Sequence, residues 1–344
     1  MTLNPQQLLT FLATSIAARL PILITGAPGI GKSDVVAQAA AAAGADLIIS
    51  HPAVADPTDA KGLPWPVAGE KSATFLPFGE LAQALAATEP TVWFLDDLGQ
   101  ASPAVQASYM QLLLARRVNG HVLPDCVTFV AATNRRTDRA GVTGILEPVK
   151  SRFASIVELE ADVDQWSRWA LDHGVDAMTV AFIRFRPELL SAFEASADLT
   201  QSPSPRTWSH ASKLFALDLP QNILAVALAG AVGEGAAAER IGFERLYTSL
   251  PALDAILTDP DSATIPSDPA ALYAVSTMLG NAATPENFGN IRKYCQRLMD
   301  TQHGEFAALT LRDSTHKNPA VCHTADFVAL VSSPLGSLMS GELS

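Results

Sequence analysis

The pattern of apolar and polar positions divides the chain into an alternating first part and a helical second part. In residues 1–158, short apolar runs alternate with segments of helical periodicity, which is typical of a parallel sheet between helices. The predicted strands are Ile22–Thr25, Leu47–Ser50, Thr91–Leu95, Val127–Ala131 and Ser155–Leu159. The predicted helices of this part are Pro5–Arg19, Asp34–Gly44, Gly79–Ala87 and Pro103–Arg117. Together they predict a three-layer α/β core around a parallel five-stranded sheet.

The strand pattern fades from Asp162 onward, and helical periodicity takes over. The predicted helices are Asp164–Leu171, Met178–Phe185, Thr207–Ala216, Ile223–Val232, Ala270–Leu279, Pro285–Met299 and Ala325–Val331. A proline-rich break spans Asp259–Pro269 and separates the last three of these from the others. We therefore expect an α/β core over residues 1–160, an all-α domain over 161–250 and a helical C-terminal extension over 251–344.

Composition agrees with a soluble protein of two or three domains. The chain has 344 residues, of which 48% are hydrophobic and 17% charged. No apolar run approaches the roughly 20 residues that span a bilayer, so we expect no membrane insertion. The start, Met1–Asn4, lacks the basic residues of a secretion signal. Three widely spaced cysteines give no disulfide or metal spacing, which favours a cytoplasmic location.

Charge is distributed unevenly along the chain. The net charge is −12, and residues 159–344 hold 12 Lys/Arg against 22 Asp/Glu, a balance of −10. Proteins that follow a nucleic-acid backbone need a basic surface. The acidic second half therefore makes nucleic acid an unlikely partner.

Residues 26–33 form a complete phosphate-binding loop. They read G-A-P-G-I-G-K-S, between the predicted strand Ile22–Thr25 and an alanine-rich helix. Glycines allow backbone N–H groups to point at phosphate oxygens at the positive end of the helix dipole. Lys32 would reach the β- and γ-phosphates of ATP, and the Ser33 hydroxyl would bind Mg²⁺. The expected nucleotide contacts are Gly26, Ala27, Pro28, Gly29, Ile30, Gly31, Lys32, Ser33 and Asp34.

Polar side chains follow two further apolar strands. Asp96 and Asp97 end the strand that begins at Thr91, and Asn134 closes the segment Phe129–Asn134. Beside a phosphate loop, Asp96 would hold Mg²⁺, usually through water. Asp97 would orient and polarise the attacking water as a general base.

These motifs in this order resemble the AAA+ ATPase superfamily. A Gly-x-Pro-Gly-x-Gly-Lys-Ser loop is followed by an acidic strand end and then by Ala-Thr-Asn. The resemblance implies a Mg²⁺-dependent ATPase in which Asn134 is the first sensor and helps to position the lytic water. It also implies an AAA+ core followed by a helical lid. One departure is Asp97, because the family usually has Glu there and Asp is one methylene shorter.

The resemblance further implies arginines that act at the γ-phosphate. Arg152, in Val149-Lys150-Ser151-Arg152-Phe153, corresponds to the arginine finger that reaches the nucleotide of the neighbouring subunit. Arg135, Arg136 and Arg139 stay open as alternatives, in trans or as an extra sensor. Arg206, in Ser204-Pro205-Arg206-Thr207, resembles the second sensor at the start of a lid helix.

Within AAA+ proteins the chain is similar to the MoxR-like, helix-2-insert group. Residues 56–64 resemble an acidic-glycine segment of that group, and residues 65–76 predict a β-hairpin around Gly69-Glu70-Lys71. Such hairpins face the central pore in relatives, and Val118–Val122 is a second candidate pore loop. Both segments therefore become candidate contacts to a client.

Three hypotheses about function follow. The first is a homo-oligomeric ring ATPase, with six subunits by resemblance, that remodels, activates or assembles a protein client. A von Willebrand factor A domain partner is implied by resemblance alone. The second is a nucleic-acid loader or translocase, which would need basic pore loops. The third is an ATP-binding scaffold with little turnover, which only Asp97 favours.

Overall fold

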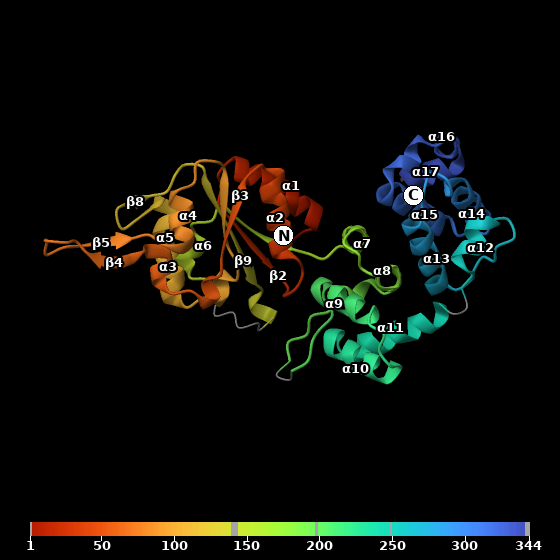
Figure 1. Ribbon diagram of the computed structural model, residues 1–344, viewed down its shortest axis with the longest axis horizontal. Coiled ribbons are helices and arrows are strands. Elements are labelled where there is room, and N and C mark those ends of the chain that lie inside the picture. Colours follow the sequence, from red (N-terminus) through yellow and green to blue (C-terminus); the bar gives the residue numbers. More distant parts are fainter. Residues whose placement is uncertain (1, 139–143, 197–198, 248–249, 341–344) are drawn as a thin grey trace. The chain divides into compact units, whose positions relative to one another are not determined.

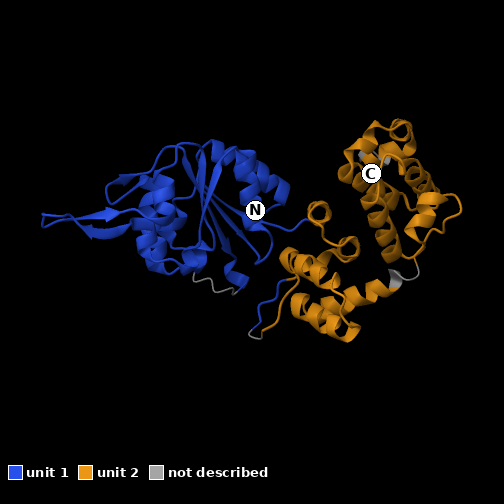
Figure 2. Cartoon of the chain, viewed as in Figure 1, with its two compact units in different colours: residues 1–162, 193–197 blue, residues 163–192, 198–344 orange. Residues whose placement is uncertain are grey.

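The computed structural model describes the chain except for residues 1, 139–143, 197–198, 248–249 and 341–344. It contains two compact units, which Figure 2 colours separately. The first comprises residues 1–162 with 193–197, and the second comprises residues 163–192 with 198–344. The expected boundary between a lid and an extension at residue 250 stays a prediction.

The first unit is built on a six-stranded, wholly parallel sheet (Figure 1). Its order is β1-β10-β2-β9-β6-β3. The strands are β1 (Thr2–Leu3), β2 (Ile22–Gly26), β3 (Asp46–Ser50), β6 (Thr91–Leu95), β9 (Val127–Asn134) and β10 (Ser155–Leu159). The parallel α/β class is confirmed, but the predicted count of five strands is wrong. The extra strand, β1, is two residues long and joins the sheet only through its pairing with β10, so no periodicity could reveal it.

Alternating residues of the central strands pack against two helical layers. Val92 and Phe94 of β6 lie in one cluster with buried residues of α1 and α2. Trp93 and Leu95 lie in the other cluster, with buried residues of α4 and α5. Period-2 alternation with both faces covered explains why these strands read as continuous apolar runs.

Short helices and two hairpins complete this unit. The helices are α1 (Pro5–Ala17), α2 (Lys32–Ala42), α3 (Pro57–Lys61), α4 (Gly79–Leu85), α5 (Pro103–Ala115) and α6 (Glu147–Lys150), with 3₁₀ turns η1 (Pro52–Val54), η2 (Leu98–Gln100) and η3 (Arg136–Asp138). The predicted hairpin is confirmed as β4 (Leu63–Pro66) paired with β5 (Ala73–Leu76). The second candidate pore loop is also a hairpin, of β7 (Arg117–Val118) and β8 (His121–Val122).

The second unit contains helices and no strand among its described residues. The helices are α7 (Val163–Asp172), α8 (Ala177–Phe185), α9 (Pro205–Phe215), α10 (Gln221–Val232), α11 (Glu234–Tyr247), α12 (Leu253–Thr258), α13 (Pro269–Asn281), α14 (Phe288–Asp300), α15 (Gly304–Lys317), α16 (Ala325–Val331) and α17 (Pro334–Ser340), with 3₁₀ turns η4 (Pro187–Leu189) and η5 (Pro319–His323). Residues 256–335 supply one apolar cluster of this unit, centred on α13, α14 and α15. No helix within the described ranges has the length and apolar character to cross a membrane.

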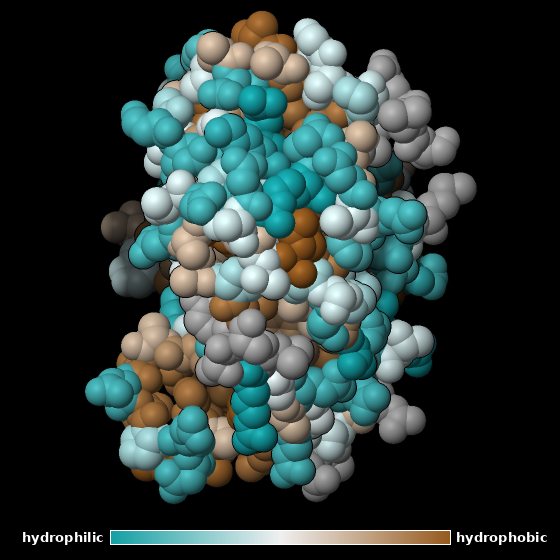
Figure 3. All heavy atoms as spheres, turned by 90° about the vertical axis from the view of Figure 1, so that its right-hand side faces the viewer, coloured by the Kyte–Doolittle hydropathy of each residue, from teal (hydrophilic) through white to brown (hydrophobic). Residues whose placement is uncertain are grey.

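Helix α10 carries no charged side chain, yet part of its surface is exposed. Leu228 and Val232 are buried, whereas Ile223 and Val226 are 50% and 73% exposed. Apolar side chains gather low on the face shown in Figure 3, at the level where Figure 1 draws this helix. One side of α10 therefore packs into the unit and the other faces solvent.

Candidate functional site

The glycine loop lies at the carboxyl end of β2, where the chain turns into α2. Gly26 is the last residue of the strand, and Lys32 is the first residue of the helix. Gly29 and Gly31 have φ angles of +73° and +104°, which residues with a β-carbon rarely adopt. The loop thus has the glycine-dependent form of a phosphate cradle at a helix N-terminus.

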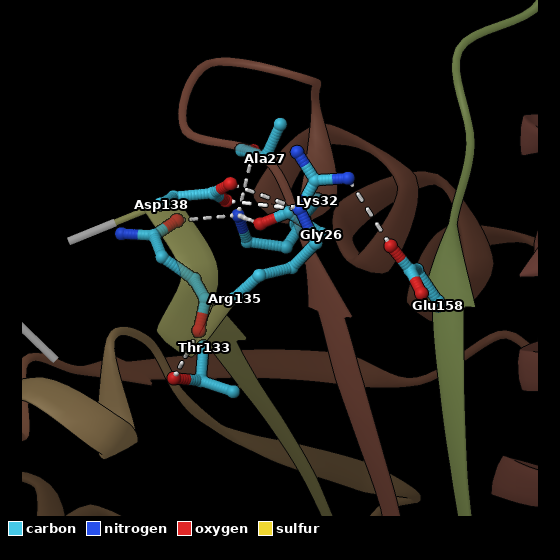
Figure 4. Close-up of polar contacts among 8 residues, drawn as sticks. Gly26, Ala27, Lys32, Thr133, Arg135, Asp138 and Glu158 are labelled. Atoms are coloured by element: carbon cyan, nitrogen blue, oxygen red, sulfur yellow. Dashed lines mark hydrogen bonds and ion pairs between the residues drawn. The ribbon is translucent and has the colours of Figure 1, made fainter. Parts of the chain in front are cut away.

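The Lys32 ammonium is buried within this loop, with the residue only 7% exposed. Its Nζ donates to the carbonyl oxygens of Gly26 and Ala27, each at 3.0 Å, and to Asn134 Oδ1 at 2.7 Å. Figure 4 shows this group of contacts. Gly26 and Asn134 are register partners on β2 and β9, which explains why the three acceptors surround one ammonium. Lys32 is therefore held where a phosphate would meet the loop.

Ser33 and Asp96 form the part of the site suited to a divalent cation. Ser33 Oγ donates to Asp96 Oδ2 at 2.8 Å, although 63 residues separate them. A hydroxyl oxygen beside a carboxylate is the hard oxygen donor set that Mg²⁺ prefers, usually with water completing its shell. These residues fit the predicted metal site.

Asp97 and Asn134 lie together at the same edge of the sheet. Asn134 Nδ2 donates to Asp97 Oδ1 at 3.4 Å, while the oxygen of the same amide accepts from Lys32. Asp97 follows β6 and has φ +56° and ψ +35°, a left-handed conformation that costs energy outside glycine. The amide thus joins the phosphate-loop lysine to the candidate general base.

Arg135, the residue directly after β9, is held by two carboxylates of its own unit. It contacts Asp138 at 3.0 Å and Glu158 at 3.3 Å (Figure 4). The hydrogen bond to Asp138 raises the pKa of Arg135. Sequence reasoning named Arg135 but missed both carboxylates. Asp138 lies three residues away in η3, whereas Glu158 comes near Arg135 only because β9 and β10 lie on either side of β2.

Arg152 lies at the opposite edge of the sheet from the glycine loop. It precedes β10, which runs parallel to β2 with Ser155 opposite Ile22 and Glu158 opposite Thr25. The five residues of β10 span about 16 Å along the sheet, between the edge where Arg152 lies and the edge that holds the glycine loop. Arg152 Nε donates to Met110 O at 3.0 Å, and Nη1 donates to Pro148 O.

The other predicted site residues have simple placements. Arg136 is exposed in η3, and Arg139 lies outside the described residues. Asp34 is exposed in the first turn of α2, where a negative charge favours the helix dipole. Arg206 is exposed at the second position of α9, as expected for a helix start, and belongs to the second unit.

Comparison with solved structures returns AAA+ proteins at low identity. A point mutant of Thermotoga maritima RuvB is 15% identical, with a TM-score of 0.43 over 80% of this chain and 81% of that one. The Thermotoga maritima RuvB Holliday junction branch migration motor is 16% identical, with a TM-score of 0.39 and the same coverage. NtrX from Brucella abortus in complex with ADP is 16% identical, with a TM-score of 0.37 over 97% of this chain and 68% of that one.

A search of curated proteins gives no match to the chain. A family model does match its first unit, over the stretch that holds the glycine loop, both aspartates, Asn134 and Arg152. Residues 21–153 match the model of the AAA domain of the dynein-related subfamily.

Proposed function

We propose that the chain hydrolyses ATP as one subunit of a homo-oligomeric, hexameric ring in the cytoplasm, and that the ring remodels, activates or assembles a protein client. In this proposal it is a MoxR-like AAA+ motor that works with a von Willebrand factor A domain partner. The observation that carries the proposal is the chain of contacts from Lys32 through Asn134 to Asp97, with Arg152 at the far edge of the same sheet.

Nucleotide binding follows from the loop and its lysine. Backbone N–H groups of the glycine loop and the start of α2 would surround the β- and γ-phosphates. Lys32 would exchange carbonyl and amide oxygens for phosphate oxygens, which accept stronger hydrogen bonds from an ammonium. Ser33 and Asp96 would hold Mg²⁺, which supplies neutralisation of phosphate charge when bound. Arg206 would report on the nucleotide from the lid.

Hydrolysis requires a water molecule aimed at the γ-phosphorus. Asp97 accepts its proton as general base, and the Asn134 amide orients the same water. When phosphate draws Lys32 away from Asn134 Oδ1, that amide gains freedom to turn toward the nucleotide. The contact seen between Lys32 and Asn134 thereby links the arrival of ATP to the assembly of the hydrolytic groups.

Completion of the site requires a second subunit. Arg152 and the glycine loop of its own chain lie at opposite edges of one sheet, so its guanidinium would serve the neighbouring subunit. Its bonds to Met110 and Pro148 use two of the five N–H donors of a guanidinium, which leaves donors for phosphate oxygens. An arginine supplied in this way raises phosphoryl-transfer rates by about 10³–10⁵.

The β4–β5 hairpin supports a protein client over a nucleic acid. Leu63, Trp65 and Leu76 share one face of it and are 44%, 58% and 45% exposed. Pro64 and Pro66 have no N–H to offer to an added strand, which disfavours edge-to-edge pairing. An apolar face of this kind suits the side chains of a polypeptide rather than a phosphate backbone.

The test is ATP turnover in mixed rings. Arg152→Ala should abolish turnover and leave ATP affinity within about threefold, and equimolar Asp97→Asn subunits should restore part of the activity by supplying an intact Arg152. Lys150→Ala, two residues away and partly exposed, is the matched control and should behave as wild type. Full turnover by Arg152→Ala would disprove the shared site, and stimulation by duplex DNA would favour a nucleic-acid motor.

A second candidate, an ATP-binding scaffold with little turnover, is favoured by one observation. Asp97 is one methylene shorter than the usual glutamate and is held by Asn134 at 3.4 Å, a long contact. In that case wild-type rings would bind ATP without multiple turnovers, and Asp97→Glu would increase hydrolysis. Steady-state phosphate release separates the two candidates.

A further inference from the structure

Gln106 is a buried amide that bonds to three backbone groups in two segments of the first unit. It lies in α5 and is 1% exposed. Its Nε2 donates to Ala101 O at 3.0 Å and to Gly144 O at 2.9 Å, while its Oε1 accepts from Leu146 N at 2.9 Å. Burial of an amide is unfavourable unless such bonds are made. The position therefore fixes the backbone rather than merely filling the core.

One end of this network belongs to the segment that carries the candidate general base. Ala101 follows η2, which begins directly after Asp97. Gln100 N donates to Asp97 O at 3.0 Å, and Ala101 N donates to Leu98 O at 3.3 Å. These bonds make the run from Asp97 to Ala101 one compact turn. A shift of Asp97 would therefore also displace the Ala101 carbonyl, which accepts a hydrogen bond from Gln106.

The other end belongs to the segment that carries Arg152. Leu146 is the residue that caps α6, and Val149 and Phe153 anchor the same segment in the core. Arg152 itself donates to Met110 O, one helical turn beyond Gln106 on α5. Helix α5 thus holds the segment from residue 144 to 153 at its start through Gln106 and at its end through Met110.

We propose that Gln106 is a positioning residue for the arginine that each subunit offers to its neighbour. Its bonds to Gly144 and Leu146 fix the position at which the Arg152 segment begins. Its bond to Ala101 connects that segment to the turn after Asp97 in the same chain. A change at the nucleotide site of one subunit would then alter the position in which that subunit holds Arg152 for the neighbouring subunit. This inference rests on the proposed shared ATPase site, and it assigns a function to a residue that touches neither nucleotide nor water.

The experiment uses full-length Gln106→Met, which keeps side-chain length and removes all three hydrogen bonds. Alone, it should lower kcat more than tenfold and leave the Kd for Mg·ATP within about threefold. Gln111→Met, at an exposed glutamine of the same helix, is the matched control and should leave kcat unchanged. A nucleotide-binding defect of similar size to the kcat defect would overturn the proposal.

Mixed rings show whether Gln106→Met impairs the Arg152 that a subunit offers to its neighbour or the nucleotide site of the subunit itself. Equimolar Gln106→Met and Asp97→Asn should regain activity, because the second variant supplies a correctly held Arg152 to the intact site of the first. Gln106→Met with Arg152→Ala should stay inactive, because neither supplies one. Three other outcomes would overturn the proposal: Gln106→Met regains activity only with Arg152→Ala, regains it with both partner variants, or regains it with neither.

A third mixture separates failure of the inference from failure of the proposed function. Arg152→Ala with Asp97→Asn must complement if the site is shared, and its failure would overturn both. If Gln106→Met does not fold by circular dichroism, Gln106→Glu is used, since it keeps the acceptor for Leu146 N and loses both donors. If neither variant folds, Gln106 serves the fold alone and the proposal is wrong.

Discussion

A buried ion pair in the second unit provides a quantitative test of its packing. Arg184 of α8 binds Asp313 of α15 through two hydrogen bonds, of 2.6 and 2.9 Å, and also donates to Thr277 of α13 at 2.9 Å. The two charged side chains are 4% and 5% exposed. Three helices that are far apart in the sequence are thereby joined by one guanidinium.

Asp313→Leu removes the carboxylate and leaves that guanidinium buried without its counter-charge. The loss of one partner from a buried pair costs about 3–5 kcal/mol. Since about 1.36 kcal/mol corresponds to a factor of ten, amide hydrogen exchange in α13 and α15 should accelerate on the order of 10²- to 10⁴-fold. Exchange measured by mass spectrometry resolves these helices, and peptides from β6 in the other unit serve as the internal reference.

Two further variants complete the test. Arg184→Met with Asp313→Leu removes both charges and should recover most of the lost stability. Glu188→Gln breaks an ion pair with Arg186 whose side chains are 58% and 36% exposed, and should change exchange by less than about tenfold. An Asp313→Leu effect no larger than that of Glu188→Gln, or a double variant less stable than the single one, would refute this account.

Three more outcomes follow from the structure. Lys32→Met should weaken ATP binding by at least about tenfold, since each charge-assisted bond to phosphate contributes roughly 1.5–3 kcal/mol, whereas exposed Lys71→Met should not; isothermal titration measures both. Gly31→Ala forces a β-carbon to φ +104°, at about 1–2 kcal/mol, and should lower ATP affinity and thermal stability, whereas Gly230→Ala in α10 should leave both intact. Burial raises the pKa of Cys295 to about 12, so its thiol should resist iodoacetamide at pH 8 until the protein unfolds, as peptide mass spectrometry would show.

The sequence predicted what depends on neighbouring residues. The glycine loop and the buried strands carry local signals, since a contiguous motif or an apolar run determines each of them. The boundaries of β6 and β10 are those expected, and the β4–β5 hairpin lies where its turn residues indicated. Helix α15 was missed because its buried face consists largely of small or polar residues, among them Ala307, Thr310 and Ser314, which hide the apolar period.

What the sequence could not predict are contacts between distant segments. Lys32 meets Asn134 over 102 residues, Gln106 meets Leu146 over 40, and Arg184 meets Asp313 over 129. Each pair forms only because strands or helices lie side by side, and strand order is a property of the fold rather than of any local pattern. The same reason explains why the choice among the arginines stayed open.

The strand order itself restricts that choice. Strands β10 and β9 lie on either side of β2, and both run parallel to it. Residues that precede β10 therefore lie at the amino edge of the sheet, and residues that follow β9 lie at the carboxyl edge with the glycine loop. Arg135 follows β9, so it lies at the edge that holds the glycine loop of its own chain, where Asp138 and Glu158 form ion pairs with it. Arg152 precedes β10 at the amino edge, so in the proposed function its guanidinium would act on a phosphate of another subunit. Among the arginines with a described partner, the direction of one strand thus separates Arg135, at the edge of the sheet that holds the glycine loop, from Arg152, at the opposite edge.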